Sequence, residues 1–122
     1  MNTWLLVAAV LSAGICWLHT FVGGRRIARP LLTAPLPSKP KHTSYFCWHI
    51  VTLVLAALGI MFLYAAVQPE GVDVAWVAVG LTASIAVYGI VMPPSLRLKY
   101  TDHPQGWLFV PVAIVGAWGC LS

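Results

Sequence analysis

Four long apolar runs divide the chain, and polar residues gather between them. The runs cover residues 4–22, 44–67, 72–92 and 106–121. A helix needs roughly 20 mostly apolar residues to cross a bilayer, and the first three runs meet that length. Because hydrocarbon offers no water to pair backbone groups, spans of this kind are expected to be helical. The pattern predicts an all-α integral membrane four-helix bundle, with residues 1–122 forming a single transmembrane domain.

The fourth run is the shortest, and it leaves an alternative open. Trp107 and Phe109 can lie at a membrane interface, and Pro111 falls in the first turns, where proline is tolerated. We therefore expect a fourth span, with a segment lying along the interface as the alternative. The first run lacks the basic residues that precede a signal peptide's apolar core, so we expect it to remain as a span.

The connections between the runs are predicted from their glycines and prolines. Gly23 and Gly24 are expected to end the first helix. Residues 30–41 contain four prolines and are expected to be non-helical and to lie along the interface. Thr43 or Ser44 is then expected to cap the second helix. Residues 68–71 read as a tight turn between the second and third helices.

Composition agrees with a membrane protein. Hydrophobic residues make up 60% of the chain and charged residues only 8%, whereas a soluble domain carries roughly a quarter charged residues. The net charge of +4 is explained first by membrane orientation, so nucleic acid is not an expected partner.

The charges are divided unequally among the connections. Every Lys and Arg falls in the first or the third connection, whereas Glu70 falls in the second and Asp73 directly beside it. The basic residues are Arg25, Arg26, Arg29, Lys39, Lys41, Arg97 and Lys99. Because positive charge is retained on the cytoplasmic side, we expect both basic connections to be cytoplasmic and both termini to be periplasmic. The expected location is the bacterial inner (cytoplasmic) membrane.

Small and weakly polar residues form a stripe along each of the first two helices. At spacings of three and four they share one helix face, of the kind that membrane helices use to pack closely. The first stripe is Ala9, Ser12, Cys16, His19 and Gly23, and the second is Tyr45, His49, Thr52, Ala56 and Gly59. We expect these stripes to face the bundle interior and each other. Weaker stripes on the later helices suit docking to other membrane proteins (Gly80, Ser84 and Tyr88; Ala113, Gly116 and Cys120).

His19 and His49 are expected at similar depth, each about one turn from the cytoplasmic end of its helix. Ionisable residues inside a membrane are functional candidates by default. The predicted ligand-binding residues are His19, His49, Arg25, Arg26, Arg29, Tyr45 and Trp48. The alternative is that the histidines only donate hydrogen bonds that fix helix packing.

Several chemistries remain open for this site. Two facing imidazoles, His19 and His49, could be axial ligands of haem b, with arginines holding the propionates. The arginines alone could bind an anion or a lipid headgroup. Zinc is disfavoured, because Cys47 and His49 are two residues apart and point to opposite sides of a helix. The three cysteines show no CxxC spacing.

The pattern favours a non-enzymatic role. There is no pair of carboxylates within the spans and no phosphate loop, nucleophile elbow or HExxH motif. We expect a small accessory or ligand-binding protein, a subunit of a larger membrane complex or a self-associating protein in contact with membrane lipids. The alternatives are a haem- or quinone-linked redox protein, a lipid-active enzyme using His19 and His49, and a small oligomeric transporter.

Three motifs resemble those of a family of small, uncharacterised four-span inner-membrane proteins of bacteria. They are HxxxGGRxIARPLL at residues 19–32, YxCWH at residues 45–49 and PQxxLF at residues 104–109. The resemblance covers most of the chain and implies the four-helix fold. It implies no activity.

Overall fold

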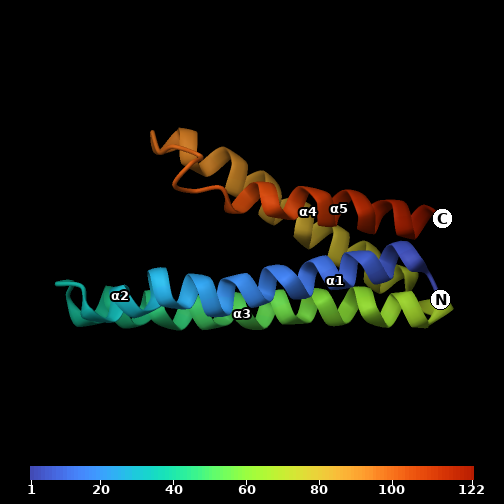
Figure 1. Cartoon of the computed structure of the whole chain (residues 1–122), viewed down its shortest axis with the longest axis horizontal. Coiled ribbons are helices and arrows are strands. Elements are labelled where there is room, and N and C mark those ends of the chain that lie inside the picture. Colours follow the sequence, from blue (N-terminus) through green and yellow to red (C-terminus); the bar gives the residue numbers. More distant parts are fainter.

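The computed structural model describes residues 1–122 and is built entirely from helices (Figure 1). In chain order the elements are α1 (Thr3–Trp17), η1 (Leu18–Ala28), α2 (Arg29–Thr33), α3 (Ser38–Val67), η2 (Pro69–Gly71), α4 (Val72–Ser95) and α5 (Gln105–Leu121). The predicted all-α bundle is confirmed. Three continuous helical stretches are long and apolar enough to cross a membrane, and α5 is a shorter apolar helix of 17 residues.

The chain forms two antiparallel hairpins. One pairs α1, η1 and α2 with α3, and the other pairs α4 with α5 (Figure 1). Both termini and η2 lie at one end of the molecule. The α2–α3 and α4–α5 connections lie at the other end, where the hairpins spread apart. The two basic connections are therefore on the same end, as the four-run pattern predicts.

The core lies toward the end that holds the termini. Its 14 buried residues are Leu5, Ala8, Ala9, Leu55, Leu58, Phe62, Ala65, Ala66, Ala75, Ala78, Val79, Ala86, Phe109 and Val112. Half of these are alanines, and glycines bring the helices closer still. A Cβ added to Gly116 would lie 2.8 Å from the Phe62 ring, and one added to Gly119 would lie 2.8 Å from the Leu5 side chain. Small residues therefore let α5 approach α1 and leave room for the Phe62 ring of α3, as is usual for membrane helices.

The prediction that the first helix ends at Gly23 and Gly24 is wrong. The chain continues without a break as the π-helix η1 to Ala28 and then as α2 to Thr33. Neither glycine has the positive φ of a helix-ending conformation. Gly23 instead provides space, because a Cβ there would lie 2.8 Å from the Trp48 indole.

The prediction of a non-helical segment over residues 30–41 is also wrong. Only residues 34–37 separate α2 from α3. Pro40 lies in the first turn of α3, where a missing backbone N–H costs no helical hydrogen bond. Pro30 lies inside the continuous helical stretch from Thr3 to Thr33, so its missing N–H leaves one carbonyl of the preceding turn without a helical donor. Thr43 and Ser44 consequently lie inside α3 and do not cap it. Its N-cap is Pro37.

The end of α4 also passes through prolines. Pro93 and Pro94 lie in its last turn, so the carbonyl of Ile90 lacks the N–H donor that residue 94 would supply. The Tyr100 hydroxyl donates to this carbonyl at 2.7 Å. Beyond the helix, Arg97 adopts a positive φ of 56°. The N–H groups of Leu98 and Arg97 donate to the carbonyls of Pro93 and Pro94 at 2.7 and 3.1 Å, which completes a Schellman motif.

Candidate functional site

The predicted stripes on the first two long helices meet along the α1–α3 interface. A Cβ added to Gly59 would lie 3.7 Å from the Ala13 nitrogen and 3.8 Å from the Ser12 Cβ. One to two turns further along, the Cys16 thiol donates to the Thr52 carbonyl at 3.8 Å. The small residues of α1 and α3 therefore pack face to face, and the prediction is confirmed over this part of the interface.

Near the basic end, His19 packs on Trp48. The imidazole and indole rings are stacked, with centroids 3.9 Å apart and planes at 16°. The Nε2 of His19 lies 3.2 Å from the Trp48 carbonyl oxygen. Because a carbonyl can only accept, Nε2 carries the proton in this contact. The edge of the same indole lies next to Gly23, so Trp48 of α3 contacts both His19 and Gly23 of η1.

His49 has an aromatic partner of its own. Its imidazole lies edge-on against Tyr45, with centroids 4.6 Å apart and planes at 81°, and its side chain is exposed. Ala56 is exposed as well. Trp48 and His49 are neighbours in α3, so their side chains leave the helix about 100° apart. The two imidazoles therefore contact different aromatic partners: His19 is stacked on Trp48, and His49 lies edge-on to Tyr45.

The π-helix η1 changes which residues share a face. It has 11 residues, with the sequence LHTFVGGRRIA, and is therefore longer than most π-helical segments, which are single turns. Many π-helical segments lie at functional sites. The less exposed residues of this segment are His19, Gly23, Gly24 and Ala28. Their spacings of four and five match i→i+5 bonding. In an α-helix, His19 and Ala28 would lie about half a turn apart.

On another face, the π-helical spacing brings basic and aromatic side chains together around a hollow. The hollow has a volume of about 350 Å³, and its lining residues are Trp17, Phe21, Val22, Arg25 and Arg26. The Trp17 and Phe21 rings lie 5.6 Å apart between centroids. An α-helix would place Arg26 about half a turn away from Trp17, because nine residues are two and a half turns. The π register instead brings both arginines beside the aromatic pair.

The charge at this end is almost entirely positive. Arg29 is exposed in α2, outside the lining of the hollow, and Lys39 and Lys41 follow in the first turns of α3. The three acids of the chain are Glu70, Asp73 and Asp102. Glu70 and Asp73 lie at the opposite end, and Asp102 lies in the α4–α5 connection. The predicted residues thus divide into an arginine hollow and a separate His19–Trp48 contact, with Tyr45 and His49 beside it.

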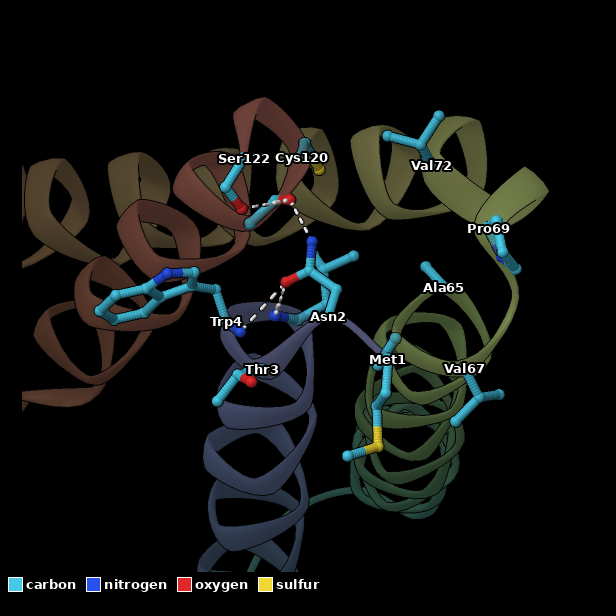
Figure 2. A pocket seen from close by; sticks show the side chains of 13 residues that line it. Met1, Asn2, Thr3, Trp4, Ala65, Val67, Pro69, Val72, Cys120 and Ser122 are labelled. Carbon is cyan, nitrogen blue, oxygen red and sulfur yellow. Dashed lines mark hydrogen bonds between the residues drawn. The ribbon is translucent and has the colours of Figure 1, made fainter.

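A second hollow, of about 520 Å³, lies at the end that holds the termini. Figure 2 shows Asn2 at its centre, between α1, α3 and α5. The Asn2 Oδ1 accepts from the N–H groups of Trp4 and Leu5, both at 3.1 Å. Its Nδ2 donates to the Gly119 carbonyl at 2.7 Å, and its backbone N–H donates to the Ala66 carbonyl at 2.8 Å.

Asn2 therefore satisfies unpaired backbone groups at the ends of three helices. Asn2 was not among the predicted binding residues. Its position directly before an apolar run is the signal of a helix N-cap and would have identified the first of these roles. Its contacts with α3 and α5 depend on the tertiary structure.

No group of three or more His, Cys, Asp or Glu side chains is arranged to hold a metal ion. Comparisons with protein-family models, with curated proteins and with solved structures found no match to this chain. The resemblance of the three motifs to a family therefore stays a prediction.

Proposed function

We propose that the protein is a multi-span accessory protein of the bacterial inner membrane that binds a ligand at its cytoplasmic surface. In this proposal both termini are periplasmic, and the end that carries η1 and the two basic connections is cytoplasmic. The motif resemblance to small four-span inner-membrane proteins points the same way. The binding residues are Arg25 and Arg26, with Trp17 and Phe21 as their apolar neighbours.

The observation that carries the proposal is the separation of charge along an apolar bundle. All seven Lys and Arg lie toward one end, and Glu70 and Asp73 lie at the other. This division is typical of membrane proteins, in which Lys and Arg are enriched in the cytoplasmic loops. Helix length agrees, because the 30 residues of α3 extend about 45 Å and the hydrocarbon core is about 30 Å thick. The excess accommodates the first turns of α3, which carry Lys39 and Lys41.

The accessory role is supported by how little of the helices the bundle covers. Within the most apolar window of each long stretch, 28% of the residues are buried. On α4, Gly80 has open space where a Cβ would stand, and Ser84, one turn further, is exposed. A small residue on an uncovered face allows another membrane helix to approach closely. Such a face suits docking to the subunits of a larger complex.

The orientation is tested by labelling single cysteines in intact cells. Cys16, Cys47 and Cys120 are first replaced by serine, and one cysteine is then introduced at Glu70, Lys39 or Lys99. A membrane-impermeant maleimide should label position 70 from outside, and should label positions 39 and 99 only after the inner membrane is opened. The opposite labelling pattern would refute the orientation.

The accessory role is tested by gentle solubilisation and affinity purification of the tagged chain from its own membrane. A stoichiometric membrane-protein partner is the expected result. Recovery of the chain alone, with lipid as its only companion, would exclude the accessory role.

A further inference from the structure

We infer that the hollow on η1 binds one anionic phospholipid of the cytoplasmic leaflet. The phosphate lies between the guanidinium groups of Arg25 and Arg26, and an acyl chain lies along Trp17 and Phe21. The inference deepens the proposed function and rests on it, because the hollow meets the cytoplasmic leaflet only in the proposed orientation. It names the ligand class that the arginine site would take.

The hollow is charged at the end near the expected membrane surface and apolar toward the middle of the bundle, which matches the headgroup and acyl chain of a lipid. Arg25 and Arg26 lie toward the basic end of the helix, and Trp17 lies two turns nearer the middle of the bundle, roughly 10 Å away along the axis. The side chains of Trp17 and Phe21 are 57% and 54% exposed, so an apolar surface is left for a ligand to cover. A small inorganic anion would use the arginines alone and would leave the aromatic wall bare.

The positive charge in the hollow has no acidic neighbour on its own hairpin. Glu70 and Asp73 lie at the far end, and Asp102 belongs to the other hairpin. Guanidinium groups match the geometry of phosphate oxygens and can bind them through paired hydrogen bonds. Basic pockets on the cytoplasmic side of membrane helices recognise anionic headgroups for this reason. Charge and shape together therefore favour a phospholipid with net negative charge over a zwitterionic one.

The test is lipid binding to the detergent-solubilised full chain, measured by native mass spectrometry. Phosphatidylglycerol and phosphatidylcholine with identical acyl chains are titrated separately. At about a factor of five per arginine, the wild type should prefer phosphatidylglycerol by roughly 30-fold. The double variant Arg25→Gln, Arg26→Gln should lose most of this preference. The matched control Arg97→Gln, Lys99→Gln removes the same charge from the other basic connection and should keep it.

Two further measurements distinguish a lipid site from a site for a small anion. Trp17→Ala, which leaves the charge unchanged, should weaken the binding of both lipids. Inorganic phosphate at millimolar concentration should not displace phosphatidylglycerol. Displacement by phosphate would show an anion site only and would overturn the inference. It would also be overturned if the Arg25, Arg26 variant kept the preference, or if the control variant lost it equally.

The labelling experiment keeps the two proposals distinct. If position 70 is labelled from outside and the lipid preference is absent, the orientation stands and the lipid site is refuted. If position 70 proves cytoplasmic, the proposed function fails first, whatever the lipid titration shows.

Discussion

His19 of η1 and Trp48 of α3 form the closest aromatic pair in the protein, with stacked rings 3.9 Å apart and a hydrogen bond from Nε2 to the Trp48 carbonyl. The contact joins residues 29 positions apart in sequence. It fixes where α3 meets the π-helix, and so indirectly where the arginines of the same helix lie. His19, which the sequence marked as a candidate ligand, packs on Trp48 in this structure.

This pair should show energetic coupling. His19→Ala and Trp48→Ala should each lower the free energy of unfolding, and the double variant should lose less than the sum. Stacked aromatic pairs contribute about 0.5–1.5 kcal/mol beyond the area that they bury. The measurement is denaturation by sodium dodecyl sulfate in mixed micelles. His49→Ala is the matched control, since its exposed ring should not couple to Trp48. Additive losses for His19 and Trp48 would contradict the contact.

The two adjacent glycines of η1 should respond differently to alanine. At Gly23 a Cβ would lie 2.8 Å from the Trp48 ring, whereas at Gly24 nothing lies within 4 Å. Gly23→Ala should therefore destabilise the chain by about 1–3 kcal/mol, which is typical of overpacking. Gly24→Ala should leave stability unchanged or raise it by up to about 1 kcal/mol, because alanine favours helices. Thermal unfolding of the two variants in the same detergent decides this. Equal effects would argue against both the tight contact at Gly23 and the open space at Gly24.

Asn2 should stabilise the bundle through two separable sets of hydrogen bonds. Asn2→Ser keeps an oxygen that can accept from the N–H groups of Trp4 and Leu5, but its side chain is too short to reach the Gly119 carbonyl. It should lose about 1 kcal/mol, the net value of one hydrogen bond. Asn2→Ala removes the cap as well and should lose about 2 kcal/mol. Equal stability of the serine and alanine variants in a denaturation series would show that the cap contributes nothing.

Arg97 is a site where a glycine should stabilise the protein. Its φ of 56° lies in the left-handed region, which costs an L-residue about 1–2 kcal/mol. Arg97→Gly should therefore raise the free energy of unfolding by about 1 kcal/mol. Arg97→Ala is the control, because it removes the charge and keeps the strain. If glycine and alanine shift the unfolding midpoint alike, the effect comes from charge and the strain argument fails.

Much of the fold follows from the sequence alone. Apolar runs of about 20 residues have one stable form in hydrocarbon, so the helices and the short turn before Val72 were predictable. The division of charge between the ends follows from four antiparallel helices. The small residues Ser12, Cys16, Thr52 and Gly59 recur at helical spacing, and the structure brings them together at the α1–α3 interface.

The tertiary structure decided the register at the basic end. Helical spacing assumes 3.6 residues per turn, and over residues 18–28 the chain departs from it as a π-helix. That departure aligns Arg26 with Trp17. The π-helix also contacts Trp48 through His19 and Gly23. Trp48 belongs to α3, so the pattern of residues 18–28 alone could not predict this contact.

The prolines between the first two long helices show the same limit of local patterns. Pro37 and Pro40 stand at the start of α3, where a proline costs no helical hydrogen bond, and Pro30 is contained in the continuous helical stretch that runs to Thr33. The helices and the end at which each charge lies were predictable, because both depend on the order of apolar and polar residues along the chain. Which side chains meet at the candidate site was decided by long-range packing.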